Sequence, residues 1–356
     1  MAHPGPPTNI PHSENVVSLS IIDTTSTIAA PAKSFVKPVL KGHEVWKVPA
    51  YAFLITNRQQ NRTILFDLGV RKDWDNLAPA LFKRLKANGF DVETKKGVRE
   101  ILDEEGIDTS ADNIEAIIWS HGHFDHTGDP STFDSGTALV IGPGIKQNLM
   151  PGYPTNQNSS LLDSDFEGRE VREVNFDEAK LQIGRFTAFD YFDDGSFYLL
   201  NAPGHAHGHM CALARLTSNP ASFVFLGGDA AHHGGEIRPS ERMPFPDTLA
   251  SLVGNGGTFC PGDLCSKLSE ECNDTTPIYR PTEAGSHLDA PTARETVGKL
   301  QDLDALENVF VVLAHDTSLL DIVDFFPKTT EGFGEKGWKG KARWAFLKDF
   351  QEIAEG

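Results

Sequence analysis

Residues 120–126 read SHGHFDH, and the apolar run IEAIIW directly precedes them at residues 114–119. A short apolar run of this kind is typical of a buried strand, so three histidines and an aspartate stand where a strand ends and a loop begins. Imidazole and carboxylate groups are the ligands that zinc and similar divalent metals bind. The stretch therefore predicts a metal site at the end of a strand.

The spacing within this stretch suggests two metals rather than one. His121 and His123 are two positions apart and can point to the same side of an extended segment. Asp125 and His126 follow a turn and can reach a second metal beside the first. Because one short stretch cannot close a metal site, the alternative of a solvated polar turn stays open unless more distant ligands exist.

Four other apolar runs end in a residue of a metal-binding type. These residues are Asp67 in LFDLG, His205 in APGHAHGH, Asp229 in GGDA and His315 in AHD. Enzyme sites are commonly built in this way, on loops held by a rigid scaffold. The repeated placement favours a shared metal site over a polar turn.

These ordered motifs, from residue 45 to residue 315, resemble those of the metallo-β-lactamase superfamily. The resemblance implies an α/β fold, a four-layer αβ/βα sandwich with a dinuclear metal site between its two sheets and a long insertion before the last metal ligand. It implies two divalent metal ions as cofactors, with Zn²⁺ as the expected species. The implied ligands are His121, His123 and His205 for one metal and Asp125, His126 and His315 for the other, with Asp229 bridging them.

Two further residues are implied as supports of the ligands. Asp67 would steady the histidine-rich loop, and supports of this kind affect ligand orientation and metal affinity. On the loop of His205, we expect His209 to support a ligand and His207 to be a packing residue.

The motif set is most similar to the N-acyl-homoserine lactonase branch, and closer still to fungal lactonase-like proteins, a group that includes hydrolases of benzoxazolinone-type rings. This resemblance implies a detoxifying hydrolase that opens a small cyclic ester, carbamate or amide by attack of a metal-bridging hydroxide. Asp125 and His232 are the expected catalytic residues. His232 stands three positions after Asp229, where bacterial lactonases of this type have a tyrosine, and we expect it to donate to the developing oxyanion.

Other activities stay open on the same predicted site. A thioesterase of the glyoxalase II or fungal type would use the same ligands. Di-iron redox chemistry is disfavoured, because that branch usually has Glu at the position of His123. A pseudoenzyme that only binds ligands is disfavoured, because all seven expected ligands are present.

The composition limits the partners of the chain. With 50 acidic and 32 basic residues, the formal net charge is −18, which disfavours nucleic acid and anionic membranes because both require basic surface. No apolar stretch approaches the length of a membrane span, and the N-terminus lacks the layout of a signal peptide, so the expected location is cytoplasmic. The expected partner is a small cyclic substrate, and a homodimer is compatible with the sequence.

The distribution of proline-rich, polar and irregular segments along the chain predicts its domain organisation. We expect one metallo-hydrolase domain over residues 1–356. Residues 1–14 are Pro-rich and polar, which predicts a flexible or draped lead-in. Residues 233–290 are long and irregular, which is typical of a functional lid or binding loop.

The insertion holds several residues that carry weaker signals. The spacing of Cys260, Cys265 and Cys272 is not a standard zinc pattern, so free thiols or one local disulfide are expected, with a structural metal as the alternative. We expect His287 and Glu283 to lie on the surface. Outside the insertion, His3, His12 and His43 are not expected to be ligands.

Apolar periodicity and turn residues predict strands interleaved with helices. The expected strands are residues 16–22, 45–55, 63–66, 114–119, 138–141, 212–216, 223–226 and 309–313, with a turn near 57–61 and a hairpin over 186–200 that turns at 193–195. The expected helices are residues 74–88, 98–105, 290–306 and 341–353. This order favours sheets covered by helices over an all-β domain.

Overall fold

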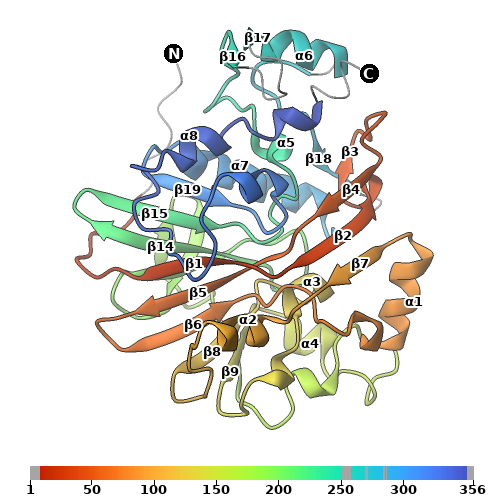
Figure 1. Cartoon of the computed structure of the whole chain (residues 1–356), viewed down its shortest axis with the longest axis vertical. Coiled ribbons are helices and arrows are strands. Elements are labelled where there is room, and N and C mark those ends of the chain that lie inside the picture. The colour runs from red at the N-terminus through yellow and green to blue at the C-terminus, as the bar shows by residue number, and fades with distance from the viewer. Residues whose placement is uncertain (1–8, 251–257, 269–271, 284, 286, 351–356) are drawn as a thin grey trace.

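Two six-stranded sheets form the centre of the structure (Figure 1). The computed structural model describes residues 9–250, 258–268, 272–283, 285 and 287–350. The first sheet has the order β1 (Ser18–Asp23), β5 (Tyr51–Asn57), β6 (Arg62–Phe66), β8 (Ile114–Ile118), β9 (Ala138–Ile141) and β10 (Val171–Glu173). The second has the order β11 (Leu181–Ile183), β12 (Phe186–Asp190), β13 (Phe197–Asn201), β14 (Met210–Ser218), β15 (Ala221–Leu226) and β19 (Val309–Val312).

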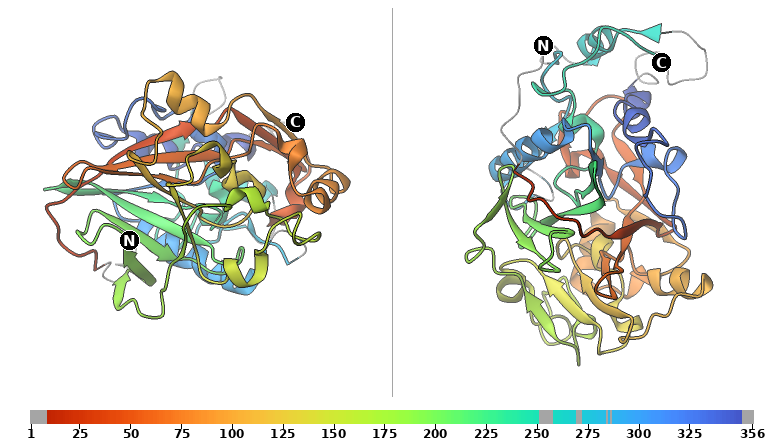
Figure 2. Two further views of the ribbon diagram at one scale, coloured as in Figure 1. Left: turned by 90° about the horizontal axis from the view of Figure 1, so that it is seen from below. Right: turned by 90° about the vertical axis from the view of Figure 1, so that its left-hand side faces the viewer.

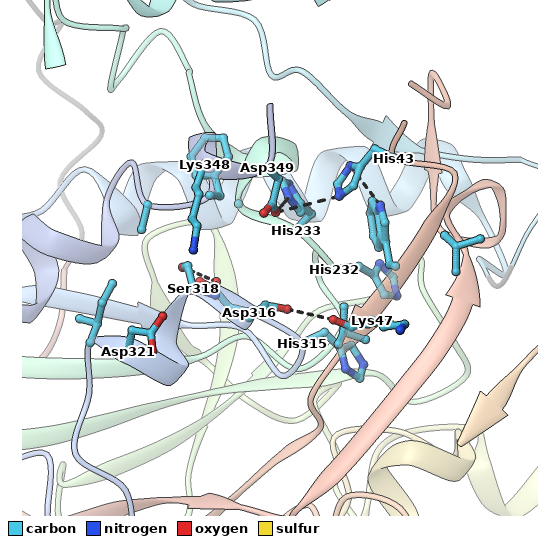
Figure 3. A pocket seen from close by; sticks show the side chains of 18 residues that line it. His43, Lys47, His232, His233, His315, Asp316, Ser318, Asp321, Lys348 and Asp349 are labelled. Atoms are coloured by element: carbon cyan, nitrogen blue, oxygen red, sulfur yellow. Dashed lines mark hydrogen bonds and ion pairs between the residues drawn. The ribbon is translucent and has the colours of Figure 1, made fainter. Parts of the chain in front are cut away.

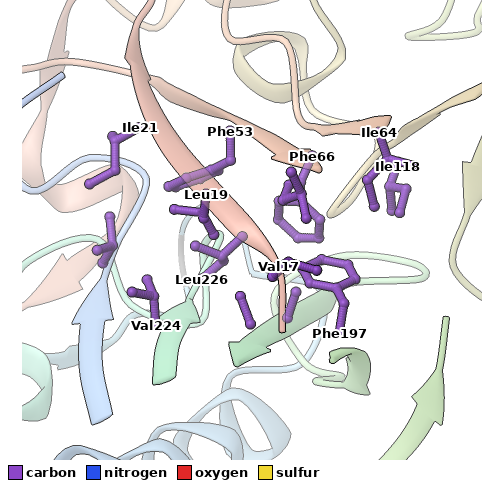
Figure 4. Close-up of a cluster of buried hydrophobic side chains, with 14 of the residues drawn as sticks. Val17, Leu19, Ile21, Phe53, Ile64, Phe66, Ile118, Phe197, Val224 and Leu226 are labelled. Carbon is purple, nitrogen blue, oxygen red and sulfur yellow. The ribbon is translucent and has the colours of Figure 1, made fainter. Parts of the chain in front are cut away.

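The space between the two sheets is filled by one apolar core. Leu19 and Phe53 of the first sheet meet Phe197 and Leu226 of the second in this core (Figure 4). In β5, Phe53 faces the core while its neighbour Leu54 faces the outer side of the sheet, as the two-residue period of a strand requires. Both faces of the first sheet are therefore buried, which explains why its strands read as continuous apolar runs.

Helices cover the outer faces of both sheets. On the first sheet, α2 (Val98–Glu104) packs through Leu102 and α4 (Ile145–Leu149) packs through Ile145. On the second, α7 (Ala290–Asp304) packs through Leu300. The left view of Figure 2 shows the red and orange strands of the first sheet lying over the green strands of the second. This arrangement confirms the predicted four-layer αβ/βα sandwich.

A smaller region lies beside the two sheets, with a three-stranded sheet of order β4-β2-β7 and two short sheets, β3-β18 and β16-β17. Its strands are β2 (Ser26–Pro31), β3 (Val36–Lys37), β4 (Val45–Val48), β7 (Asp91–Thr94), β16 (Leu249–Ala250), β17 (Thr258–Phe259) and β18 (Arg280–Pro281). The remaining helices are α1 (Pro79–Ala87), α3 (Phe124–Thr127), α5 (Gly234–Ile237), α6 (Pro261–Leu268) and α8 (Trp338–Ala342), with 3₁₀ turns η1 (Ala32–Ser34), η2 (Trp74–Asn76), η3 (Pro130–Thr132), η4 (Asp163–Asp165) and η5 (Thr317–Asp321). Among the described residues, no helix is both long and apolar enough to cross a membrane.

Prolines interrupt two predicted elements. The single strand predicted over residues 45–55 is wrong, because the chain leaves β4 before Pro49 and then enters β5, which belongs to a different sheet. Proline has no backbone N–H to donate to a ladder, so a strand readily ends there. The single helix predicted over residues 74–88 is also wrong: η2 comes first, and α1 begins at Pro79, since proline disfavours helical backbone in the residue before it.

Parts of the predictions for the two chain ends fall on described residues. Residues 1–8 of the predicted lead-in lie outside the described residues. Ser13 donates a hydrogen bond to the carbonyl of Asp194 at 2.6 Å, so the segment around Ser13 is draped over the hairpin between β12 and β13. The closing helix predicted over residues 341–353 is wrong at 343–346, where turns follow α8. Residues 351–353 of that prediction lie outside the described residues.

The described parts of residues 233–290 join the smaller region. Cys265 and Tyr279 share an apolar core with Trp46 and Phe346, and Figure 1 shows α6, β16 and β17 together at one end of the molecule. Cys265 forms a disulfide with Cys272, while Cys260 is free, so the expectation of one local disulfide is confirmed. The lid role of this segment stays a prediction.

Candidate metal centre

Several candidate site residues lie where neighbouring parallel strands end, whereas His205 follows β13, which is antiparallel to both of its neighbours. Asp67 follows β6 and residues 121–126 follow β8, and these strands are parallel neighbours in the first sheet. Asp229 follows β15 and His315 follows β19, which are parallel neighbours in the second. Ligand sites form at the carboxyl ends of such strands, because the loops that leave them meet at one edge.

Asp229 lies between two groups of ligand-type side chains. Its Oδ2 is 3.6 Å from Nε2 of His121 and 3.2 Å from Nε2 of His205. Its Oδ1 is 3.0 Å from Nε2 of His126 and 3.1 Å from Nε2 of His315. One carboxylate oxygen therefore faces each group, which is the arrangement of a bridging ligand.

Each group is compact enough to hold one cation. Ligand atoms lie within 4.8 Å of one another in the group His121, His123, His205 and Asp229 and, separately, in the group Asp125, His126 and His315. Nδ1 of His123 is 3.0 Å from Nε2 of His205. Oδ2 of Asp125 is 3.6 Å from Nε2 of His315. The structure thus brings all seven predicted ligands to one place.

The hydrogen bonding and protonation of these side chains fit bound cations better than an ordinary polar core. Nε2 of His121 is buried without a hydrogen-bond partner among the described residues, although buried polar atoms are normally paired. Burial lowers the pKa of His121 and of His205 well below its usual value, so both rings are neutral and present the lone pair that a metal binds. Burial raises the pKa of Asp229, but nearby imidazoles, His126 first, hold it well below its usual value. The donor set fits two divalent cations.

Buried hydrogen bonds orient this donor set. Oδ1 of Asp67 accepts the backbone N–H of Ser120 at 2.6 Å, and its Oδ2 lies 2.8 Å from Nδ1 of His126. Nε2 of His209 accepts the backbone N–H of Asp229 at 2.9 Å, while its Nδ1 donates to a backbone carbonyl of its own loop. Asp67 and His209 therefore lie where the sequence predicted supports for the ligands.

The segment between β4 and β5 also orients a ligand-type side chain, that of His315. The carbonyl of Pro49 accepts a hydrogen bond from Nδ1 of His315 at 2.7 Å, which leaves Nε2 of that ring facing Asp229. The backbone N–H of Tyr51 also donates to the carbonyl of Ala314 at 3.0 Å. The proline that ends β4 thus orients a ligand-type histidine, a role that no motif in the sequence indicated.

His232 lies against the same carboxylate. Its Nε2 is 3.3 Å from Oδ2 of Asp229, and its ring is parallel to that of His315 at 6.0 Å. The ring of Phe35 contacts its other side at a centroid distance of 4.8 Å. Burial lowers the pKa of His232, but Asp229 and Glu236 raise it to about 10, so the ring is placed to donate a hydrogen bond into the centre.

His287 lies in the centre, so the predicted surface position is wrong. Its side chain is only 9% exposed, and its ring centroid lies 5.1 Å from that of His205 and 5.4 Å from that of His232. Burial lowers the pKa of His287 to about 3. A single histidine in an irregular segment carries no periodic signal, so its neighbours in the chain could not place it. Glu283, by contrast, lies on the surface as predicted.

His43 and His233 form a separate cluster with Asp349. The indole N–H of Trp46 donates to Nδ1 of His43 at 3.2 Å, and the backbone N–H of Gly235 donates to Nδ1 of His233 at 2.9 Å. Nδ1 of His43 also lies 2.6 Å from the hydroxyl oxygen of Tyr279, and Nε2 of His233 lies 3.2 Å from Oδ2 of Asp349. The ligand atoms of these three side chains lie within 4.8 Å of one another, and the expectation that His43 is not a ligand stays a prediction.

A cavity of about 450 Å³ opens beside the metal centre. His232 and His315 line the side nearest the centre, and His43, His233 and Asp349 lie above them in Figure 3. Cavities of this size accommodate small molecules. The centre is therefore accessible to a small ligand.

Comparisons with known proteins identify the family of this chain. The family model of the metallo-beta-lactamase superfamily matches residues 45–315. The chain is 44% identical over 358 residues to the gamma-lactamase FDB1 of Fusarium pseudograminearum, with 98% of this chain and 86% of that protein covered. It is 44% identical over 354 residues to the metallo-hydrolase mfmC of Annulohypoxylon moriforme, with 98% and 91% covered.

A second gamma-lactamase and a solved structure complete the comparison. MBL2 of Gibberella moniliformis is 46% identical over 240 residues, which cover 67% of this chain and 100% of that protein. The crystal structure of a quorum-quenching N-acyl homoserine lactone hydrolase superposes with a TM-score of 0.58 at 15% identity, over 89% of this chain and 99% of that one. The latter likeness concerns the fold. From its motifs, its donor set and these relatives, the chain belongs to the metallo-β-lactamase superfamily and is a metal-dependent hydrolase.

Proposed function

We propose that the protein is a dinuclear-metal hydrolase that opens a small ring containing an ester, carbamate or amide bond. The observation that carries the proposal is the placement of Asp229, whose two oxygens face two separate groups of ligand-type side chains. The proposed ligands are His121, His123 and His205 for one cation and Asp125, His126 and His315 for the other, with Asp229 shared. Zn²⁺ is the proposed metal, since imidazole and carboxylate ligands suit it.

The residues around the centre would have distinct roles in hydrolysis. Two divalent cations bound here would supply an activated water and polarise a substrate carbonyl. Asp67 holds the ring of His126 with Nε2 directed at the centre, and His209 holds the backbone of Asp229. His232 would donate a hydrogen bond to the carbonyl oxygen as negative charge develops on it. None of these roles needs a serine or cysteine nucleophile.

The preference for a small ring over a long acyl thioester has three supports. Two relatives at 44% and 46% identity are gamma-lactamases. The cavity of about 450 Å³ matches a small molecule. A formal net charge of −18 makes the chain a poor partner for the phosphates of coenzyme A, which favour Lys and Arg.

Residues 233–290 contribute to the wall of the substrate pocket in this proposal. His233 and Gly234, at the start of the segment, line the cavity, and His287, near its end, contacts the rings of the centre. The insertion therefore reaches the site from both of its ends.

Metal analysis and a substrate panel test the proposal. The purified protein should contain about two zinc ions per chain and should open cyclic carbamates, γ-lactams or lactones faster than glutathione or coenzyme A thioesters. Asp229→Ala should lose metal and activity, whereas the control His207→Ala, at a half-buried histidine of the neighbouring loop, should keep both. An active preparation without metal, or a fully active Asp229→Ala protein, would contradict the metal site; faster turnover of thioesters would contradict the substrate class.

A further inference from the structure

The backbone of two rigid elements holds His287 beside the metal centre. The N–H of Leu288 donates to the carbonyl of His205 at 2.8 Å, and the N–H of Asp289 donates to the carbonyl of Gly204 at 2.8 Å. Gly204 has a φ of +120°, and a Cβ at this position would lie 2.2 Å from the backbone nitrogen of Ala293 in α7. The loop of His205 is thus clamped against α7, and His287 is fixed to that loop.

Among the residues that the structure describes, none forms a hydrogen bond with the ring of His287 in this position. Both Nδ1 and Nε2 are buried without a hydrogen bond, and the side chain is 9% exposed. Nε2 of His205 lies 3.2 Å from Oδ2 of Asp229. The nitrogens of His232 have no hydrogen bond either, but Nε2 of that ring lies 3.3 Å from Oδ2 of Asp229. Because buried polar atoms are normally paired, the nitrogens of His287 point to a ligand.

The chemistry of a neutral imidazole limits what that ligand offers. One ring nitrogen carries a proton and the other presents a lone pair. In the proposed function the cations and His232 act on the carbonyl oxygen of the substrate. The oxygens of Asp229 face the imidazoles that surround this carboxylate. A ring N–H next to that carbonyl is a donor and needs an acceptor. The free lone pair of His287 supplies one.

We propose that His287 accepts a hydrogen bond from the ring N–H of the substrate. The site then selects cyclic carbamates and lactams with a free N–H over lactones and N-alkylated rings, because a site built to hydrogen-bond a polar group discriminates strongly against analogues that lack it. This inference rests on the proposed ring-opening function and assigns its substrate class. In this proposal His287 contacts the substrate and is not a ligand of either cation.

Three matched rings test this assignment: 2-benzoxazolinone with a free N–H, its N-methyl derivative, and 2-coumaranone, in which CH₂ replaces N–H. His287→Ala should lower kcat/KM for the N–H ring by about 10- to 100-fold, as expected for a lost hydrogen bond in a buried site, and change the other two by less than about threefold. His287→Gln, which keeps an acceptor oxygen, should recover part of the loss. The control His207→Ala should leave all three values unchanged, and metal content should stay at the wild-type level throughout.

Three outcomes would overturn the assignment. An equal loss on all three rings would mean that His287 only positions the loop of His205. A loss of metal in His287→Gln would make the residue a ligand instead. Unchanged kcat/KM for the N–H ring would leave the residue without a role in recognition. Failure of the proposed function is distinct from these, because the wild-type protein would then open none of the rings.

Discussion

Oδ2 of Asp67 lies 2.8 Å from Nδ1 of His126, and neither side chain is exposed to solvent. Asp67 follows β6, and His126 lies in α3 on the loop that follows β8, the parallel neighbour of β6 in the first sheet. The contact leaves Nε2 of His126 facing Oδ1 of Asp229 at 3.0 Å. The buried carboxylate of Asp67 thereby orients the ring of His126.

Asp67→Asn should weaken the centre without removing any ligand. An asparagine can still accept the N–H of Ser120, but its NH₂ group cannot accept the proton on Nδ1 of His126. Metal affinity or kcat/KM should fall by about 10- to 100-fold, the range found when such supports are lost. Metal titration and steady-state kinetics measure this, with Asp165→Asn as a control at another buried aspartate. Equal losses in both variants would indicate a general effect on folding.

His232→Ala should lower turnover while metal content is kept. If the ring donates to the developing oxyanion, kcat on the best ring substrate should fall by about 10²- to 10³-fold. His232→Gln retains an N–H donor and should recover part of the rate. Kinetics together with metal analysis of both variants measure the effect. An unchanged kcat in His232→Ala would reduce the residue to a packing role between Phe35 and His315.

Removal of metal with a chelator should abolish activity and lower the melting temperature. Imidazole nitrogens that are buried without partners, such as Nε2 of His121, are satisfied by a bound cation and unsatisfied without it. A ligand present at a hundred times its Kd stabilises the folded state by about 2.7 kcal/mol, so addition of Zn²⁺ should restore the melting temperature in a concentration-dependent way. Differential scanning calorimetry with and without Zn²⁺ measures the shift. Identical curves would speak against metal binding.

Asp165 should make the free energy of unfolding depend on pH, away from the metal centre. Burial raises the pKa of Asp165 to about 7, although its Oδ2 accepts the N–H of Leu162 at 2.9 Å. The folded state therefore binds more protons than the unfolded state between about pH 4 and pH 7, and this contribution to stability is lost as the pH rises through about 7.

Asp165→Asn should remove this pH dependence and keep the hydrogen bond to Leu162. Urea unfolding of the wild type and the variant between pH 4 and pH 8 should show a difference in stability that grows in favour of the variant as the pH rises. The control Asp177→Asn, at an exposed aspartate, should follow the wild type. Parallel curves for all three proteins would contradict the raised pKa of Asp165.

The sequence by itself determined the strands that carry the candidate ligands. Residues 114–119, 223–226 and 309–313 were predicted as strands and correspond to β8, β15 and β19. Each is apolar because both faces of its sheet are covered, and a polar ligand-type residue follows each within three positions. Such signals lie within a few residues of one another, so they are visible without any tertiary contact.

Only the tertiary structure decided which residues support and complete the centre. His287 is tied to His205 by a contact across 83 positions of the chain, from the N–H of Leu288 to the carbonyl of His205. Pro49 contacts His315 because the chain changes sheets between β4 and β5. Neither residue lies in a periodic segment, and each acts through a neighbour that is distant in the chain. Local patterns report which face of a strand is buried, whereas the partner of a loop residue depends on how all the layers pack.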